Sequence, residues 1–134
     1  MATQTKVLSF PEALAEKVHN LGSDTLTIAL TNTTPTTTWT QLSDLTEVSY
    51  TNLSTRVITT TSSSSSAGTY TLALEDLVLT ASGGAVAEFR YVYIYNDTAT
   101  NDELISYTDY GSALTLADTE TLTLNFDAST ITLA

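Results

Sequence analysis

An alternation of apolar and polar residues with a period of two runs through most of the chain after Gly22, and it restricts the fold more than any other feature. In the segment DTLTIALT (24–31), the leucines and the isoleucine fall on one face of an extended strand and threonines on the other. The pattern returns in TYTLALE (69–75) and TETLTLNF (119–126), with turn-forming residues between such segments. We therefore predict an all-β protein, an antiparallel β-sandwich or jelly-roll-like barrel of about eight short strands.

The residues before this alternation predict one short N-terminal helix. Ser9, Pro11 and Glu12 form an S-x-x-E capping box with a proline in the first turn. Apolar residues then recur at helical spacing, and Gly22 is a good C-terminal stop. We predict a helix over about residues 11–20.

A chain of 134 residues suits one domain. We predict an extended, polar N-terminal arm over residues 1–8 and a single β domain over residues 9–134. The spacing of apolar residues in the region 39–50 fits a short helix or 3₁₀ turns, whereas its threonines and serines favour an irregular, packed connection. The serine-rich run at 62–68 is expected to form a mobile hairpin tip between two strands, because it offers no side chain that can pack.

The segment EFRYVYIYN (88–96) differs from the other predicted strands because both of its faces are non-polar. Val92 and Ile94 share one face, and we expect them in the core between two sheets. Three tyrosines occupy the other face, where cross-strand packing against Ile105 and Tyr107 is the favoured interpretation. The alternative is a functional tyrosine surface, which would require these side chains to be exposed in the isolated chain.

The charge balance argues against several classes of partner. Fifteen acidic residues face four basic ones, for a net charge of −11, and charged residues make up only 14% of the chain. Such a surface repels phosphate, so we predict neither nucleic acid nor membrane as a partner. Threonine, serine and asparagine leave a neutral polar surface that suits contact with another protein. The chain has no cysteine, and its first residues contain no apolar signal-peptide region, so we expect synthesis in a cytosol.

No arrangement of residues indicates catalysis. His19 is the single histidine, no nucleophile motif accompanies it, and a partly exposed position in the last helical turn explains it. Acidic and amide residues crowd the 97–103 loop, but their spacing is not that of a calcium-binding loop, and a solvated turn explains them. We predict a protein that is not an enzyme, with no cofactor and no metal ligands. Calcium binding by the 97–103 loop stays open.

Candidate contact residues come from the arm and from the tyrosine strand. Arg90 fits either a strand-end arginine paired with an acid or an interface arginine, since arginine and tyrosine are both enriched at binding surfaces. The polar arm suits contact with a neighbouring subunit, although terminal residues are also commonly frayed. The residues that we predict to contact partners are Thr3, Gln4, Lys6, Arg90, Tyr91, Tyr93 and Tyr95.

Three segments together resemble a known group of proteins. FPEALAEKVHNLGSDTLTIALTNTTP (10–35), SAGTYTLALEDLVLTASGGAVAEFRYVYIYNDT (66–98) and ELISYTDYGSALTLADTETLTLNFD (103–127) are similar to segments of small virion structural proteins of tailed bacteriophages. The resemblance covers most of the chain and involves turns and packing positions, with the serine run and the Trp39 region matched least. Within that group, this pattern is associated with capsid decoration (cement) proteins.

The resemblance implies a protein that binds the outer surface of the capsid and stabilises it by bridging neighbouring subunits. It implies the major capsid protein as a partner, a homo-oligomer with a trimer favoured, and location in the virion after synthesis in the bacterial host cytoplasm. Two alternatives remain: a structural module associated with the phage tail or baseplate, and a carbohydrate-binding module that uses Trp39 or the tyrosines with the 97–103 loop.

Overall fold

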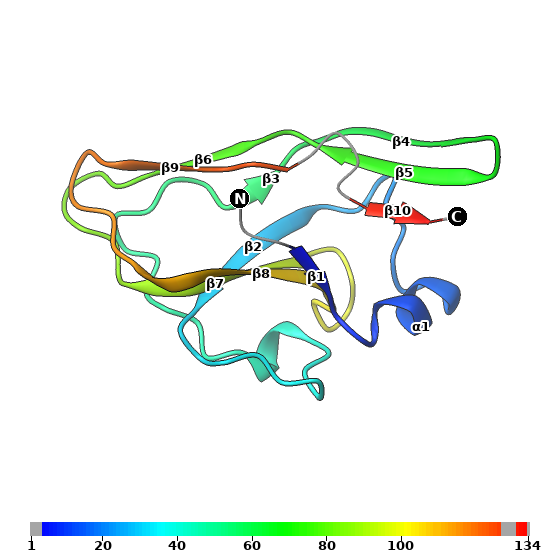
Figure 1. Ribbon diagram of the computed structural model, residues 1–134, viewed down its shortest axis with the longest axis horizontal. Helices are drawn as coiled ribbons and strands as arrows, with labels where there is room; N and C mark the ends of the chain where they lie inside the picture. Colours follow the sequence, from blue (N-terminus) through cyan, green and yellow to red (C-terminus); the bar gives the residue numbers. More distant parts are fainter. Residues whose placement is uncertain (1–3, 127–130, 134) are drawn as a thin grey trace.

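The computed structural model describes residues 4–126 and 131–133, and their strands form two layers (Figure 1). Every strand pair among these residues is antiparallel. One layer is a five-stranded sheet in the order β1-β8-β7-β2-β3. Its members are β1 (Gln4–Lys6), β8 (Leu104–Leu114), β7 (Phe89–Asn96), β2 (Leu26–Thr31) and β3 (Val57–Ile58).

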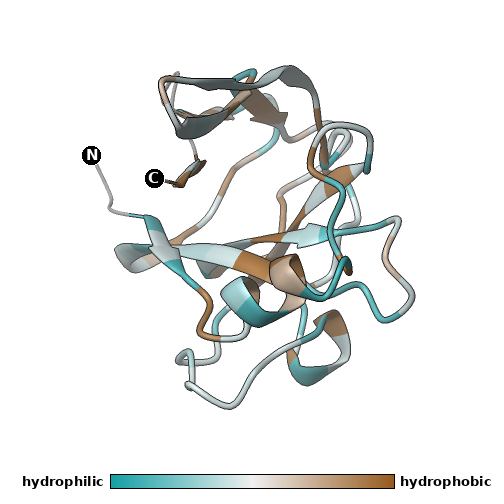
Figure 2. Ribbon diagram, turned by 90° about the vertical axis from the view of Figure 1, so that its right-hand side faces the viewer, coloured by the Kyte–Doolittle hydropathy of each residue, from teal (hydrophilic) through white to brown (hydrophobic). Residues whose placement is uncertain are grey.

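The other layer combines a three-stranded sheet in the order β10-β5-β4 with a two-stranded sheet, β6-β9. Hydrophobic residues recur on strands of both layers (Figure 2). The fold is therefore all-β and sandwich-like, as predicted. The ten strands of the described residues exceed the predicted number because β1 lies in the segment predicted as an arm, and because β3 and β4 divide one predicted strand. The strands of this second layer are β4 (Thr60–Ser66), β5 (Thr69–Leu74), β6 (Leu77–Thr80), β9 (Thr121–Leu124) and β10 (Ile131–Leu133).

The main hydrophobic core lies between the two layers. Val92 and Ile94 of β7 belong to it, which confirms their predicted place. They share this core with leucines of the opposite layer, among them Leu72 of β5, Leu79 of β6 and Leu124 of β9, all at most 2% exposed. Full burial of an aliphatic side chain of this size contributes about 1.5–3 kcal/mol. Pairing of the alternating apolar faces therefore accounts for the stacking of the layers.

The helix α1 (Phe10–Ala15) has six residues, so the predicted helix over residues 11–20 was too long. Lys17 adopts a left-handed conformation with φ of 67°, and its N–H bonds to the Leu14 carbonyl at 3.3 Å. The Val18 N–H bonds to the Ala13 carbonyl at 2.8 Å. These two bonds form a Schellman motif, which ends the helix at Ala15, well before Gly22. The predicted capping box is absent too, because the Ser9 side chain makes no capping hydrogen bond.

The helical elements of the described residues, α1 and the three-residue 3₁₀ turn η1 (Leu42–Asp44), are both too short to cross a lipid bilayer.

The serine-rich run is a strand, which corrects its prediction as a hairpin tip. β4 pairs with β5 along the run, with Ser63 opposite Leu72 and Ser66 opposite Thr69. The tip is the dipeptide Ala67-Gly68, whose φ angles of 49° and 83° suit a tight hairpin turn. Backbone pairing does not require side chains that pack, and β5 supplies the apolar residues of this hairpin. Its serines are exposed.

Candidate functional site

The tyrosines of β7 lie on the face of the five-stranded sheet that points away from the other layer. The exposed fractions of Tyr91, Tyr93 and Tyr95 are 4%, 1% and 4%. They belong to a second hydrophobic cluster, separate from the core between the layers. This burial supports the packing interpretation and leaves no exposed tyrosine face on the single chain. The other members of the cluster are Val7, Ala29, Leu45 and Leu104, with Trp39, Leu42 and Tyr107 packed against them.

An irregular segment over residues 39–45 covers part of this face. It contains η1, and the rest has no regular structure, so both alternatives predicted for this region occur together. Two backbone hydrogen bonds tie the segment to the end of the β7–β8 loop: the Leu42 N–H donates to Asp102, and the Leu104 N–H donates to Thr40, at 3.0 and 2.9 Å. These two bonds form an isolated antiparallel bridge between Gln41 and Glu103, so a single bridge at the start of β8 holds the cover, not a paired strand.

One of the two predicted tyrosine neighbours lies elsewhere. Tyr107 is directly opposite Tyr93, and their ring centres are 5.2 Å apart, as expected for a cross-strand pair. Ile105 instead packs in the core between the layers. A register shift in the β7–β8 pair, between Ile94 and Tyr95, causes the difference. A bulge reverses the in–out order of one strand, so residues two apart no longer share a face.

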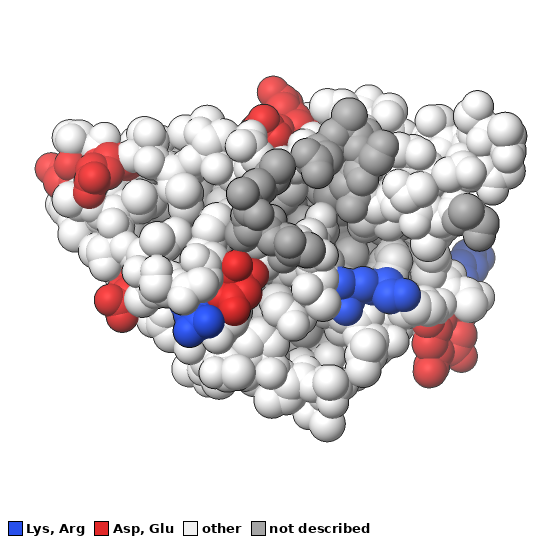
Figure 3. Space-filling model, in the orientation of Figure 1, with Lys and Arg blue, Asp and Glu red and all other residues white. Residues whose placement is uncertain are grey.

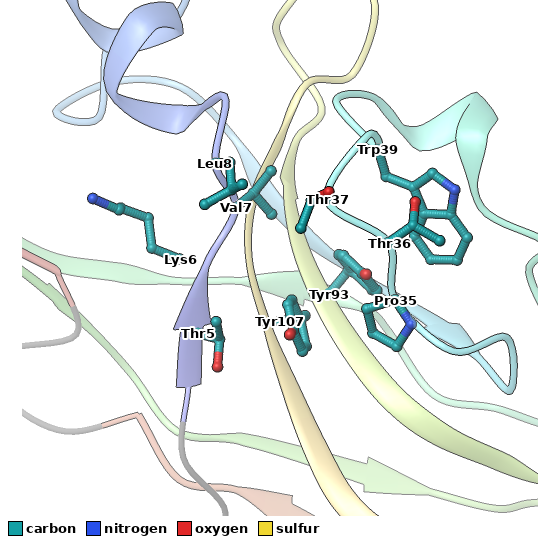
Figure 4. A pocket seen from close by; sticks show the side chains of 10 residues that line it. All are labelled: Thr5, Lys6, Val7, Leu8, Pro35, Thr36, Thr37, Trp39, Tyr93 and Tyr107. Carbon is teal, nitrogen blue, oxygen red and sulfur yellow. The ribbon is translucent and has the colours of Figure 1, made fainter.

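A groove remains where the cover is incomplete. Residues 5–8 form one wall, residues 34–37 form the other, and Tyr93 and Tyr107 lie between them (Figure 4). The deeper hollow has a volume of about 130 Å³, and the shallower one, which reaches Tyr91 and Asp109, about 470 Å³. The two hollows share Thr5, Pro35 and Tyr107, so they form one feature, which we call the tyrosine groove.

Tyr93 is a neutral contact group of the groove. Burial raises the pKa of Tyr93 well above its usual range, and the neighbouring Tyr107 and Tyr91 add to the shift. The indole of Trp39 lies 6.1 Å from the Tyr93 ring, and these two rings form the aromatic part of the deeper hollow together with Tyr107. A phenol that stays protonated serves neither as a base nor as a nucleophile at neutral pH. Tyr93 is therefore a contact group of the groove.

Arg90 forms an ion pair at the shallow end of the groove. Its Nε and one terminal nitrogen donate to the two carboxylate oxygens of Asp109 at 2.8 and 3.1 Å. The guanidinium lies 5.1 Å from the centre of the Tyr91 ring. Arg90 lowers the pKa of Asp109, and a hydrogen bond from the Gly111 N–H helps. Of the two interpretations of Arg90, the structure shows the arginine paired with an acid, although both side chains stay more than a third exposed.

The predicted arm residues are placed differently from one another. Gln4 and Lys6 are in β1, opposite Thr108 and Ser106 of β8, so this part of the predicted arm is an edge strand of the sheet. The Gln4 amide donates to the Ser106 hydroxyl, whereas Lys6 is exposed and lines the deeper hollow. Thr3 lies outside the described residues. Of the arm residues that we predicted to contact partners, Lys6 is the one found at the groove.

Tyr95 lies beyond the groove, near Arg56. Burial raises the pKa of Tyr95, and Arg56 opposes the shift. The Arg56 guanidinium lies 3.8 Å from the centre of the Tyr50 ring and donates to the Ile28 carbonyl at 2.7 Å. The Tyr50 hydroxyl accepts from the Leu30 N–H at 3.0 Å. This end of the tyrosine face is a hydrogen-bonded network, so Tyr95 shares the buried cluster of Tyr91 and Tyr93 but does not line the groove.

His19 and the acidic loop do not form a group of metal ligands among the described residues. His19 is 5% exposed and follows the helix, so the prediction of a partly exposed residue in the last helical turn was wrong. Within residues 4–126 and 131–133, no group of three histidine, cysteine or acidic side chains is placed to hold a metal ion. In the 97–103 loop, burial and repulsion by neighbouring carboxylates raise the pKa of Asp102.

The sequence reasoning missed one wall of the groove entirely. Residues 34–37 belong to a threonine-rich stretch that reads only as a polar loop, and Pro35 is the single feature that marks it. Val7 and Leu8 sat in the predicted arm, but neither was singled out. Leu8 is 65% exposed at the groove rim, and the apolar pair Val7-Leu8 at the end of a polar arm was the signal available.

Comparison of the chain with protein-family models, with curated proteins and with solved structures gives no match.

Proposed function

We propose that this protein is a capsid decoration protein of a tailed bacteriophage, which binds the outer surface of the major capsid protein and bridges neighbouring subunits. The similarity of three segments to small phage virion proteins supports the proposal. The sandwich-like fold without cysteine is compatible with assembly in a bacterial cytoplasm. We also propose that the protein acts as a homo-oligomer and is not an enzyme.

The observation that carries the proposal is a surface with little charge beside a formed groove. Figure 3 shows a face on which most side chains are uncharged, with acidic groups gathered mainly toward its edges. At the groove itself, the Lys6 side chain points away from Tyr93 and Tyr107 (Figure 4), and Arg90 is neutralised by Asp109. A polar surface of this kind can lie against another protein without burying unpaired charge, which is costly.

The size of the chain permits several contacts at once. Its accessible surface is 6920 Å². A standard interface covers about 800 Å² on each partner, so there is room for two capsid subunits and a further copy of the chain. A protein that binds only the assembled shell stabilises that shell by mass action. Contact across subunit joints is therefore sufficient for the proposed activity, and no chemical step is needed.

Co-sedimentation with expanded, empty phage capsids tests the proposal. We expect stoichiometric binding by the wild type and a higher temperature of capsid disruption. Thr37→Arg places a charged side chain at the exposed groove wall and should weaken binding at least tenfold. Ser64→Arg, on the exposed serine strand of the opposite layer, is the matched control and should bind like the wild type. Absence of stoichiometric binding by the wild type would overturn the proposal.

Copy number separates decoration from the tail alternative. Quantitative proteomics of purified virions should find hundreds of copies for a protein that covers a capsid, whereas a tail or baseplate module is present in tens of copies or fewer.

The aromatic lining of the groove favours carbohydrate binding as a second candidate function. Trp39, Tyr93 and Tyr107 could pack against a sugar ring, with threonine hydroxyls nearby for hydrogen bonds. A glycan array compares the wild type with Trp39→Ala, with thermal melting of both as the control for folding. A glycan signal that depends on Trp39, without capsid binding, would favour this second function over decoration.

A further inference from the structure

A buried polar cluster lies at the end of β7, away from the tyrosine groove. Asn96, the last residue of β7, is 0% exposed, and His19 is 5% exposed. Asp24 completes the cluster. His19 and Asp24 belong to the connection between α1 and β2, whereas Asn96 begins the 97–103 loop, so the cluster joins two irregular segments that are far apart in sequence.

The hydrogen bonds of Asn96 determine which of its amide atoms faces His19. Its Oδ1 accepts from the N–H groups of Thr98 and Ala99, at 2.9 and 3.1 Å. Its Nδ2 therefore points the other way, toward His19 Nδ1 at 3.0 Å and an Asp24 carboxylate oxygen at 2.7 Å. An amide nitrogen has two hydrogens and donates both here. His19 Nδ1 must accept, so it is unprotonated, and the neutral ring has its hydrogen on Nε2.

The surroundings of the ring oppose a second proton. Nε2 is buried and has no hydrogen-bond partner among the residues that the structure describes. Phe10 packs on the ring with centres 5.4 Å apart. Burial lowers the pKa of His19 below its usual value of 6.5, while the charges of Glu103 and Asp24 oppose the shift. A proton added to Nδ1 would place that N–H against the Asn96 amide donor, where it has no acceptor.

We propose that His19, Asn96 and Asp24 form an acid-sensitive latch, in which a proton taken up by His19 Nδ1 breaks the bond to Asn96 and loosens the 97–103 loop. The charged ring is attracted to Asp24 and Glu103, and Asp97 and Asp102 add negative charge in the same loop. These carboxylates limit the loss of stability. They do not restore the bond to Asn96, because protonation converts the acceptor into a donor.

The latch reaches the cover of the tyrosine face through the same loop. The Asp97 N–H donates to the Thr25 carbonyl, and the Thr25 N–H donates to the Thr98 hydroxyl, both at 2.9 Å, so the start of the loop is held against the α1–β2 connection. The far end of the loop holds the 39–45 segment through the Asp102 carbonyl. Acid should therefore first raise the solvent exposure of the 97–103 loop and then that of the 39–45 segment. This order of opening does not depend on which partner the protein binds.

The direction of the pH effect follows from the lowered folded-state pKa. The unfolded chain takes up a proton near pH 6.5, before the folded chain does. The stability from a neutral His19 is therefore fully present above pH 6.5 and decreases as the pH falls toward the folded-state pKa. Within that window, the equilibrium constant for opening rises by up to tenfold for each pH unit.

Nuclear magnetic resonance tests the latch on the intact chain, because His19 is its only histidine and gives one imidazole signal. We expect an Nε2–H tautomer at neutral pH and a titration midpoint below 6.5. Amide hydrogen exchange, corrected for the intrinsic effect of pH, should show protection of residues 97–103 falling between pH 7.5 and 5.5, with little change at Leu72 and Ile94. A midpoint at or above 6.5, or the Nδ1–H tautomer, would overturn the proposal.

His19→Gln is the matched variant. Glutamine can present a carbonyl oxygen to the Asn96 amide but does not titrate, so protection of the loop should no longer vary across this pH range. An unchanged pH dependence in this variant would assign the effect to the carboxylates and would contradict the latch. If the variant does not fold, the tautomer and the midpoint of the wild type still decide the question.

Discussion

Val92 and Ile94 on one face of β7 meet leucines of the opposite layer, whereas Tyr91, Tyr93 and Tyr95 on the other face meet mainly an irregular cover. The first contact follows from strand pairing and stacking of sheets. The second depends on a few backbone hydrogen bonds that hold the 39–45 segment against the loop after β7. One strand is therefore buried on both sides by two different means. The tyrosine groove lies on the covered side.

The largest difference in stability is expected between side-chain truncations on the two sides of β7. Ile94→Ala should lower the free energy of unfolding by about 2–5 kcal/mol, because it leaves a cavity in the inter-sheet core. Leu42→Ala, in the half-buried cover, should cost about 2 kcal/mol or less, because the cover can relax and solvent can enter. Urea denaturation measures both. Equal costs would show that the cover is packed as tightly as the core.

A second pair of variants compares tyrosine hydroxyls. Tyr50→Phe removes an acceptor from the Leu30 N–H and a donor to Glu47, and should cost about 1–3 kcal/mol. Tyr93→Phe removes a hydroxyl that has no hydrogen bond to another described residue and lines the groove, so its effect should stay within about 0.5 kcal/mol. Thermal melting distinguishes them. A large loss for Tyr93→Phe would mean that its hydroxyl has a structural role.

High pH should weaken the covered side through its tyrosines. Burial raises the folded-state pKa of Tyr93 above the usual value of 10, and it does the same for Tyr110 in the main core. A raised pKa means that this contribution is fully present below pH 10 and is lost as the pH rises further, because the unfolded chain releases its protons first. The urea midpoint of unfolding, measured between pH 8 and 11, should therefore fall most steeply above pH 10. In Tyr93→Phe, the midpoint should fall less steeply with pH.

The smallest effect is expected at the Arg90–Asp109 ion pair. Both side chains are well exposed, and such pairs are screened by solvent and salt. Arg90→Gln should change the thermal midpoint slightly at low salt and not measurably in concentrated salt. In the capsid-binding assay, by contrast, it should weaken binding if the shallow end of the groove touches the partner. A large, salt-independent loss of stability would show that the pair is more than a surface contact.

The strands that alternate with period two were predictable, because a strand with one buried face needs no more than its own residues to indicate that face. The segments that depend on distant partners were not. β1 is a strand because β8 lies beside it, and the serine run is a strand because β5 does. Neither has an apolar alternation of its own. The helix end was missed for a different reason: a lysine occupies the left-handed position that usually favours glycine.

The sequence by itself determined the all-β class, the central place of β7 and the inter-sheet position of Val92 and Ile94, since each follows from local periodicity. Only the tertiary structure decided what covers the tyrosines, on which side Ile105 packs, and that residues 5–8 and 34–37 meet across Tyr93 and Tyr107. Alternation in the sequence shows that one face of a strand is apolar, but a bulge or an irregular segment has no sequence periodicity that would predict it. What fills such a face is therefore set by long-range contacts.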